Sequence, residues 1–461
     1  MPMDSHDESR LKRSALFFTT LTFMVSMVLW IQFDPACTDY QFTEEYNQAS
    51  FLHMHIGVDG ISLYFVLLTT FSYPIFILAS WDNISFNIKQ YLISLLILQS
   101  FIIASFVVLD LLLFYIFFEA VLIPLYFIVG SWGASENRIR AAFLLFLYTL
   151  LGSLFMLLAF LAIFHHVGST DFDAISLADI SFEEQKVLWL AIFFSLAVKS
   201  PMIPGHIWLS RAHVEAPTST SMILAGLILK LATYGYLRVL IPFLPEATSY
   251  FSPLVQIVAV VTLIYSSLTT LRQTDLKVIV AYSSVAHMAV VIIGLFSNTL
   301  QGIEGGLLLS LAHGLVSPAL FYCIGKITYV RFHTRTLRYY RGLIQSMPVF
   351  SLLFFLFILG NSGTPLTANW VGEFLALTGA LQLNPLTGLL MSTGIVLSAG
   401  YSIWLYARLC NGGSSKYLGY AKDISRIEFM VLLPLLFTTY LFGIFPNIIL
   451  NDIHLSVTNI L

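Results

Sequence analysis

Long apolar runs, separated by shorter polar segments, occupy almost the whole chain. An apolar run of about 20 residues is long enough to cross the hydrocarbon core of a bilayer as an α-helix. The pattern therefore predicts an all-α polytopic membrane protein with about 13 transmembrane helices. The predicted spans are 14–33, 61–80, 90–108, 111–131, 142–165, 187–213, 217–241, 252–270, 277–297, 303–330, 345–383, 387–411 and 429–449.

Two of these runs contain residues that break helices. The run 187–213 contains Pro201, Pro204 and Gly205, and the run 345–383 contains Gly363-Thr364-Pro365. Each run is either one broken helix or two separate spans. The positive-inside rule separates these readings, because splitting either run would transfer the later basic loops to the opposite side of the membrane.

The basic residues favour one broken helix in each run. Lys199 and Lys230 then lie within spans and only Lys186 and Arg238 lie on the far side, so the other 18 of the 22 lysines and arginines share the side of the N-terminus. This asymmetry predicts 13 spans with the N-terminus on the inner side of the membrane. Cys410, beside a basic loop, is expected to react with thiol reagents from that side.

The two broken spans are the sixth and the eleventh, and this offset of five predicts an internal repeat. Residues 90–241 and 252–411 form two five-helix repeats, each with its broken helix fourth, flanked by an N-terminal part (1–89) and a C-terminal helix and tail (412–461). Because five is odd, the second repeat inserts upside down, which is the arrangement of many transporters. The alternative is that Pro and Gly are common in membrane helices, which explains one break better than two in register.

Composition excludes several classes of protein. Hydrophobic residues make up 58% and charged residues 10%, against about 25% charged in soluble domains. A net charge of −3 gives no reason to expect nucleic acid. Cys37, Cys323 and Cys410 are far apart in the sequence, which argues against an iron–sulfur or zinc site, and neither nucleotide-binding glycine motif is present. We therefore expect no cofactor and no metal in this chain.

Four ionisable residues lie in the middle of predicted spans: Glu119, Lys199, Lys230 and Glu373. Unpaired, they would cost about 10–14 kcal/mol at about 2.5–3.5 kcal/mol each. A structural Glu119–Lys199 ion pair is one explanation, but it leaves Lys230 and Glu373 unexplained. A proton relay explains all four, because desolvated amines and carboxylates exchange protons near neutral pH.

The spans also hold four histidines, His206, His213, His287 and His313, which are further candidates for the relay because imidazole titrates near neutrality. Haem ligation is disfavoured, since no paired histidines recur on facing helices. A hydrogen-bonded structural role remains open for each histidine. With no redox centre or nucleophile in the sequence, the energy that moves protons must come from a gradient or a partner.

Several segments together resemble a known family: AVKSPMIPGHIWLSRAHVEAP, LAGLILKLATYGYLR, LRQTDLKVIVAYSSVAHM, AHGLVSPALF and GEF. They are similar to the chain 4 family of NADH–ubiquinone oxidoreductase (respiratory complex I), whose members are antiporter-like, proton-pumping membrane subunits. The resemblance implies location in the mitochondrial inner membrane with the N-terminus in the matrix. It also implies other complex I subunits and membrane lipids as partners, with NADH, flavin, iron–sulfur clusters and ubiquinone bound elsewhere in the complex.

The resemblance also implies roles for individual residues. Glu119 matches the essential glutamate of the family, Lys199 and Lys230 its two lysines, His313 the histidine that follows, and Glu373 the carboxylate assigned to proton exit. The chain departs from the family at Ser210, where a proline is usual, and it has one predicted helix fewer than the usual 14. A subunit of a multi-subunit cation/proton antiporter and a non-transporting scaffold remain alternatives.

Overall fold

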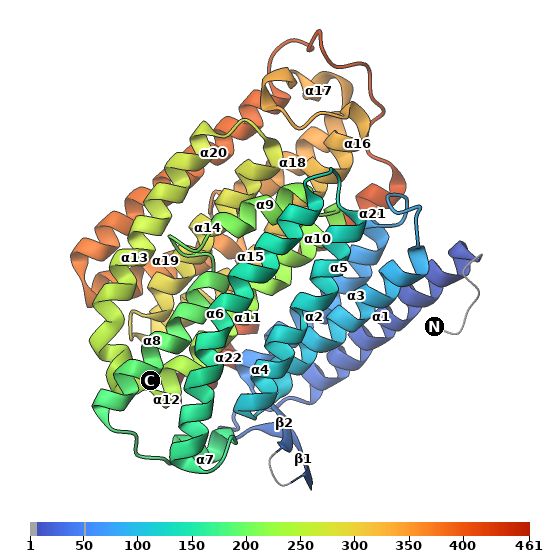
Figure 1. The fold of residues 1–461 in the computed structure, drawn as a ribbon. Helices are drawn as coiled ribbons and strands as arrows, with labels where there is room; N and C mark the ends of the chain where they lie inside the picture. Colours follow the sequence, from blue (N-terminus) through green and yellow to red (C-terminus); the bar gives the residue numbers. More distant parts are fainter. Residues whose placement is uncertain (1–6, 50–51) are drawn as a thin grey trace.

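The computed structural model describes residues 7–49 and 52–461 and is a bundle of long helices that run side by side (Figure 1). Eleven helices within the described residues are long and apolar enough to cross a membrane. This confirms the prediction of an all-α polytopic membrane protein. These helices are α1 (Glu8–Gln32), α2 (Gly60–Ala79), α3 (Ile88–Val107), α4 (Leu111–Ala120) with α5 (Leu122–Trp132), α6 (Arg138–Val167), the composite helix Thr218–Phe243, α13 (Pro245–Arg272), α14 (Leu276–Leu295), the composite helix Leu300–Phe332, α20 (Pro385–Cys410) and α21 (Arg426–Ile444).

Both interrupted runs are broken helices. In the first, α8 (Phe182–Lys199) ends before the prolines and α9 (Ile207–Glu215) resumes after them; in the second, α18 (Pro348–Asn361) is followed by α19 (Ala368–Leu383). In chain order, each broken element comes fourth in its five-element block. The two broken elements and the 11 long helices correspond to the 13 apolar runs, while the number of membrane crossings itself stays a prediction.

The two composite helices contain π-helical turns. The first consists of α10 (Thr218–Ile223), η1 (Leu224–Ile228), α11 (Leu229–Gly235), η2 (Tyr236–Leu240) and α12 (Ile241–Phe243). The second consists of α15 (Leu300–Tyr322), η3 (Cys323–Thr328) and α16 (Tyr329–Phe332). Single π turns inside helices are rare and occur frequently at functional sites.

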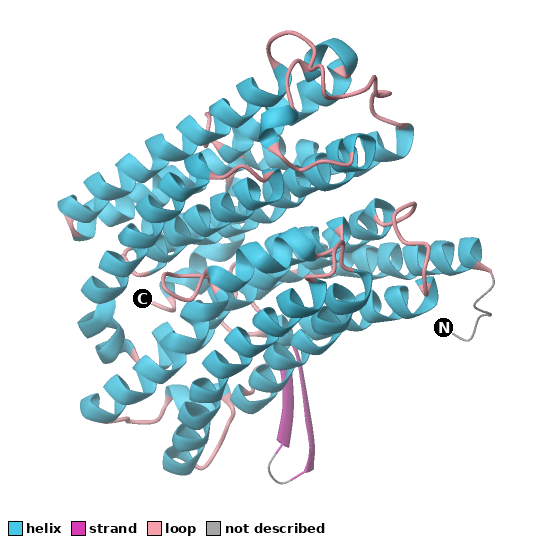
Figure 2. Cartoon of the chain, turned by 45° about the horizontal axis from the view of Figure 1, so that its top comes forward, coloured by secondary structure: helices cyan, strands magenta, loops and turns pink. Residues whose placement is uncertain are grey.

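Several short elements were not expected from the apolar pattern. They are the hairpin of β1 (Gln41–Ala49) and β2 (Leu52–Val58), α7 (Phe172–Ser176), η4 (Leu337–Tyr339), α17 (Leu343–Ser346) and α22 (Asn447–Thr458). The hairpin projects from the end of the bundle opposite α17 (Figures 1 and 2). All are too short or too polar to register as spans. The expected C-terminal tail thus contains α22, which buries Ile449, Ile453 and Val457 at helical spacing.

Polar side chains fix the start of several spans. Asp59 accepts a hydrogen bond from the backbone of Ser62 at the start of α2, and Thr299 does the same for Gly302 at the start of α15. Such caps satisfy amide groups that have no partner inside the helix. They also fix the depth at which each helix begins, and therefore the depth of the ionisable residues it carries.

Small residues bring α19 against α15. A Cβ at Gly372 would overlap the backbone of Leu309, and one at Gly305 would overlap Ala376 and Leu375. Helices in membranes associate by packing of this kind, because lipid supplies no hydrophobic driving force. The close approach places α19, which carries Glu373, directly beside the central helix α15, which carries His313.

The accessibility expected for Cys410 is wrong. Its side chain is fully buried, as is that of Cys323, whereas Cys37 is exposed between α1 and β1. The helix around Cys410 does end in a polar loop, but the side chain points into the bundle. Sequence position locates the loop, and only packing determines which way the thiol points.

Candidate functional site

The first part of the candidate site joins α4 to the break after α8. Lys199 is the last residue of α8, and its Nζ donates a hydrogen bond to the carbonyl of Phe118 at 2.7 Å. Nζ lies 4.0 Å from Oε1 of Glu119, with the lysine side chain 2% exposed and the glutamate 14%. The expected proximity of Glu119 and Lys199 is therefore present as an ion pair slightly beyond hydrogen-bond length.

The second part is centred on Lys230. Its Nζ donates to the carbonyl of Ala225, 2.6 Å away in the π turn η1, and to Nδ1 of His313 at 2.7 Å. Both side chains are buried. The π turn allows a residue five positions back to offer its carbonyl, so the local winding of the helix and the position of the amine are linked.

The third part joins α14 to the helix after the second break. Nδ1 of His287 lies 3.2 Å from Oε1 of Glu373, with both side chains almost fully buried. Gly363, in the break, has φ +62°, and a Cβ there would overlap the Glu373 carboxylate. The glycine thus serves both the left-handed turn and the space that the carboxylate occupies.

The last two parts form one continuous line. The rings of His313 and His287 lie 5.7 Å apart, centroid to centroid, so the order is Lys230–His313–His287–Glu373. The sequence places His313 next to Glu373, with His287 only a further candidate. The structure inserts His287 between them. Within the described residues, Lys199 forms no direct hydrogen bond with Lys230, although α8 packs against α11.

His206 and His213 lie apart from this line. The ring of His206 sits 6.0 Å from those of Tyr265 and Tyr282, while His213 stacks on Phe321 with 4.4 Å between centroids. Both nitrogens of His213 lack a hydrogen-bond partner in the described part of the chain. These ring contacts do not connect His206 or His213 to the other candidate residues.

Several buried polar atoms along the line have no hydrogen-bond partner within residues 7–49 and 52–461. They are both carboxylate oxygens of Glu119, Nε2 of His287, Nε2 of His313, both amide atoms of Asn369 and the hydroxyl of Tyr401. Buried polar atoms in proteins are normally satisfied, often by ordered water. These atoms lie beside the ionisable residues, so the layer holds unused hydrogen-bonding groups next to the candidate relay.

Several buried ionisable residues lie outside the four candidates in mid-span, and Arg238 and Lys277 are two of them. Arg238, expected in a loop, is buried and forms an ion pair with Asp59 at 2.6 Å. Lys277, also expected in a loop, donates to the carbonyl of Ala216 at 2.9 Å from within the first turn of α14. Both lie at the edges of apolar runs, where sequence alone does not distinguish a buried charge from a solvated one.

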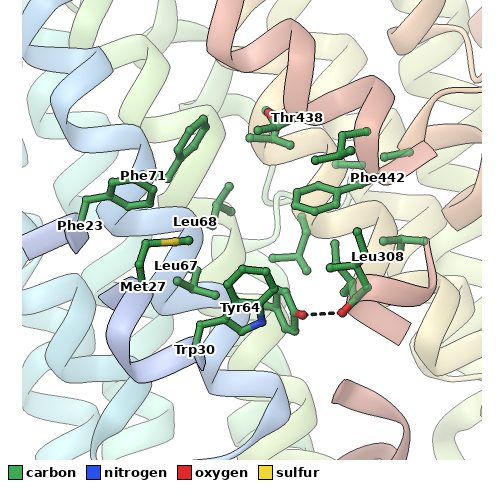
Figure 3. A pocket seen from close by; sticks show the side chains of 17 residues that line it. Phe23, Met27, Trp30, Tyr64, Leu67, Leu68, Phe71, Leu308, Thr438 and Phe442 are labelled. Carbon is green, nitrogen blue, oxygen red and sulfur yellow. Dashed lines mark hydrogen bonds between the residues drawn. The ribbon is translucent and has the colours of Figure 1, made fainter. Parts of the chain in front are cut away.

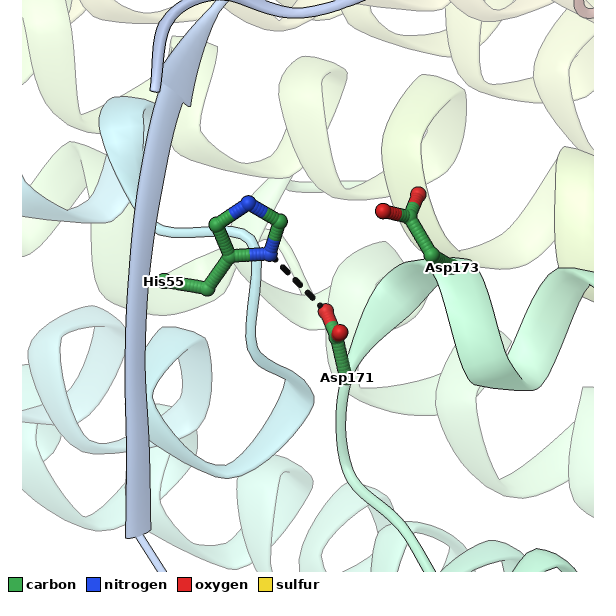
Figure 4. A group of neighbouring side chains, drawn as sticks. All are labelled: His55, Asp171 and Asp173. Carbon is green, nitrogen blue, oxygen red and sulfur yellow. Dashed lines mark hydrogen bonds and ion pairs between the residues drawn. The ribbon is translucent and has the colours of Figure 1, made fainter. Parts of the chain in front are cut away.

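A polar cavity of about 650 Å³ opens beside the hairpin and contacts Arg238, Asp59 and Tyr40. Burial raises the pKa of the Tyr40 hydroxyl, and the Arg238 guanidinium opposes that rise. His55 on β2 also contacts this cavity, and its Nδ1 pairs with Asp171 at 3.1 Å (Figure 4). This pair ties the hairpin to the segment before α7.

His55, Asp171 and Asp173 are the one group in the described residues with donor atoms close enough to hold a metal ion, all within 4.8 Å of one another. Figure 4 shows the carboxylate of Asp173 beside the His55–Asp171 pair, with no interaction drawn from it to either side chain. The His55 nitrogen is already engaged by Asp171, and Asp173 is exposed. The ion pair between His55 and Asp171 therefore explains why the donor atoms of this group lie close together.

Comparison with known proteins identifies the family. The family described as NADH:quinone oxidoreductase/Mrp antiporter, TM, matches residues 108–398. NADH-ubiquinone oxidoreductase chain 4 of Mycosarcoma maydis is 64% identical over 98% of this chain and 94% of its own length. The protein of the same description from Arabidopsis thaliana is 49% identical over 95% and 89% of the two chains.

Solved structures agree with this. A chain of respiratory complex I from Thermus thermophilus with bound NADH matches with a TM-score of 0.90 and 26% identity, covering 97% of this chain and 94% of that one. A chain of the Mrp complex from Dietzia sp. shares the fold, with a TM-score of 0.85 and 17% identity over 98% and 93% of the two chains.

The chain belongs to the family of membrane subunits that NADH:quinone oxidoreductases and Mrp antiporters share. Within it, the chain belongs with the chain 4 subunits of NADH–ubiquinone oxidoreductase, so the resemblance seen in the sequence is confirmed. The antiporter alternative is less well supported, because the relatives from Mycosarcoma maydis and Arabidopsis thaliana, at 64% and 49% identity, are both described as NADH-ubiquinone oxidoreductase chain 4.

Proposed function

We propose that this chain carries protons through the line Glu119–Lys199–Lys230–His313–His287–Glu373 as a membrane subunit of NADH:ubiquinone oxidoreductase. The chain is part of an H⁺-translocating enzyme and a multi-span protein of respiratory complex I. We place it in the mitochondrial inner membrane with its N-terminus in the matrix and the neighbouring antiporter-like subunits beside it. Electron transfer, with its cofactors, occurs in other subunits and supplies the energy.

The observation that carries this proposal is the complementarity of the two central histidines. Nδ1 of His313 accepts from Lys230, which assigns its proton to Nε2. We place the proton of His287 on Nδ1, which faces the Glu373 carboxylate at 3.2 Å, so that Nε2 of His287 is an acceptor. One ring therefore presents a donor and the other an acceptor. Neither Nε2 has a partner in the described part of the chain.

A proton can then pass from Lys230 to Glu373 with every bond accounted for. The Lys230 ammonium gives a proton to Nδ1 of His313, and His313 releases its Nε2 proton to Nε2 of His287, directly or through one water. His287 in turn gives its Nδ1 proton to Glu373. After the transfer, each imidazole carries its proton on the other nitrogen. It returns to its first tautomer only through the reverse transfer or a rotation of the ring, so a second proton cannot follow from Lys230 to Glu373 until one of these has occurred.

Glu119 and Lys199 supply the entry side of the scheme. Their 4.0 Å separation is short enough for strong electrostatic coupling inside the bundle and long enough for the partnership to be exchanged. When Glu119 holds the Lys199 ammonium, a proton on Lys230 meets less repulsion. This supports a role for the pair in biasing the charge on the second lysine.

Glu373→Gln tests the proposal. The amide keeps the shape and a hydrogen bond to His287 but cannot accept a proton. We expect the assembled complex, reconstituted in liposomes, to lose at least tenfold in proton pumping and in the oxidoreduction coupled to it. The matched control is Glu304→Gln, because Glu304 is another buried carboxylate that pairs with a histidine, His454, at 2.7 Å.

The two variants separate transport from structure. A scaffold would lose stability equally in both variants and would keep pumping wherever it assembled. Normal pumping by an assembled Glu373→Gln complex removes Glu373 from the relay. Co-purification of the wild-type chain with cation/proton antiporter subunits, and without redox subunits, would support the antiporter alternative.

A further inference from the structure

An apolar cavity of about 250 Å³ lies between α1 and α2 on one side and α15 and α21 on the other. Figure 3 shows Phe23 and Met27 facing Phe442 across this space. α1 packs on α2 and α3, α21 packs on α15 and α19, and α2 contacts both α15 and α21, so the cavity lies where these two sets of helices meet. On α1 it extends from Phe23 to Trp30, which is about 10 Å along the helix.

The described side chains that line this cavity have no free hydrogen-bond donor for a water molecule. The polar side-chain groups among the lining residues are the Trp30 indole, the Tyr64 hydroxyl and the Thr438 hydroxyl. Trp30 Nε1 and the Tyr64 hydroxyl both donate to Asp452, and the Thr438 hydroxyl donates to the carbonyl of Pro434. A buried water needs two to four polar partners, and cavities without them stay dry or take apolar ligands.

A second cavity, of about 310 Å³, continues from the end of the first and shares Trp30 and Ile448 with it. It adds Asn447, Asn451 and Asp452 from α22. Asp452 is its one ionisable lining residue within the described chain. Asn447 and Asn451 are one helical turn apart on α22, so their amide groups share one face of the helix. Both line the cavity together with the Asp452 carboxylate.

We propose that the two cavities together bind one zwitterionic phospholipid, with an acyl chain between α1 and α21 and an amine headgroup at Asp452. The apolar length of about 10 Å along α1 holds the part of an acyl chain nearest the headgroup, and the apolar walls exclude water. The carboxylate suits an ammonium group, the two asparagine amides can donate to the phosphate, and the Trp30 ring can face a quaternary ammonium. An anionic headgroup would need a lysine or arginine, and the described lining has none.

The test uses the intact complex reconstituted with phosphatidylcholine that carries a photoactivatable group in its acyl chain. After illumination, peptide mass spectrometry maps the adducts. We expect residues facing the cavity, such as Met27 and Phe442, to be labelled at least fivefold more than Met24, which is 62% exposed on the same helix. Excess unlabelled phosphatidylcholine should compete, and equal phosphatidylglycerol should not.

Matched variants sharpen the result. Met27→Trp fills the cavity and should reduce labelling of Phe442 at least fivefold, whereas Met24→Trp should leave that labelling unchanged. If Met27→Trp disturbs assembly, Leu67→Phe fills the same space from α2. Asp452→Asn keeps an acceptor for Trp30 and Tyr64 and should let phosphatidylglycerol compete equally. Equal labelling of Met24 and Met27 indicates bulk lipid only and overturns the proposal. Equal competition by phosphatidylcholine and phosphatidylglycerol in the wild type also overturns the proposal. An unlabelled cavity that a neighbouring subunit covers does the same.

Discussion

Nζ of Lys230 lies 2.7 Å from Nδ1 of His313, and neither side chain reaches solvent. An amine and an imidazole this close share a proton-accepting site, so the charge on one depends on the protonation of the other. The contact joins the central helix α15 to a helix wound as π turns on both sides of Lys230.

Lys230→Arg should reduce proton pumping by at least tenfold while the complex still assembles. Arginine retains the positive charge but does not release its proton at physiological pH, so it tests transfer rather than charge. The measurement is acidification of liposomes driven by NADH oxidation. Lys416→Arg, at an exposed position in the loop before α21, is the control and should pump normally.

His287→Gln should reduce pumping by a similar factor, because the structure places His287 between His313 and Glu373. Glutamine can hold Glu373 by a hydrogen bond but cannot relay a proton. His454→Gln removes another histidine–carboxylate contact, in which the histidine is 54% exposed, and should leave the rate within twofold of wild type. An unimpaired His287→Gln complex would show that protons bypass this ring.

Gly363→Ala should impair both assembly and pumping. Its Cβ would overlap the Glu373 carboxylate, and φ +62° disfavours any side chain. Gly400→Ala on α20 is the control, since a Cβ there meets nothing within 4 Å. The amount of assembled complex and its pumping rate per complex would be measured for both. Equal yields and rates would contradict the close approach seen here.

Asp59→Asn should destabilise the subunit strongly. Asp59 and Arg238 form a 2.6 Å ion pair with side chains about 10% exposed, and removing one partner of such a pair costs about 3–5 kcal/mol. Glu183→Gln breaks the exposed Lys186–Glu183 pair and should cost below about 1 kcal/mol. Thermal inactivation of the detergent-solubilised complex compares the two variants.

The orientation inferred from the basic loops can be tested through Cys37. It is exposed between α1 and the hairpin, whereas Cys323 and Cys410 are buried. A membrane-impermeant maleimide should label Cys37 from the intermembrane space and not from the matrix. Labelling from the matrix would reverse the predicted topology without affecting the relay geometry.

The lengths of the apolar runs were sufficient to predict the long helices, and the proline and glycine residues within two runs were sufficient to predict the breaks. Apolar runs long enough to cross a bilayer have few alternatives to helix, because lipid cannot satisfy an open backbone. Prolines at 201 and 204 and the Gly363-Thr364-Pro365 segment located both interruptions, since proline removes a helical hydrogen bond. Charges in mid-span identified Glu119, Lys199, Lys230 and Glu373 as candidates because an unpaired charge there is costly.

Only the tertiary structure decided how these candidates connect. Which face of a uniformly apolar helix points inward is not encoded in its hydrophobic pattern, so the contact of His287 with Glu373 and the burial of Arg238 and Cys410 could not be read from sequence. The hairpin and α22 were missed because they are short and mixed in polarity. The sequence determined the helical class and the positions of the two breaks through local physics, while pairwise contacts between distant segments depend on packing that only the folded bundle fixes.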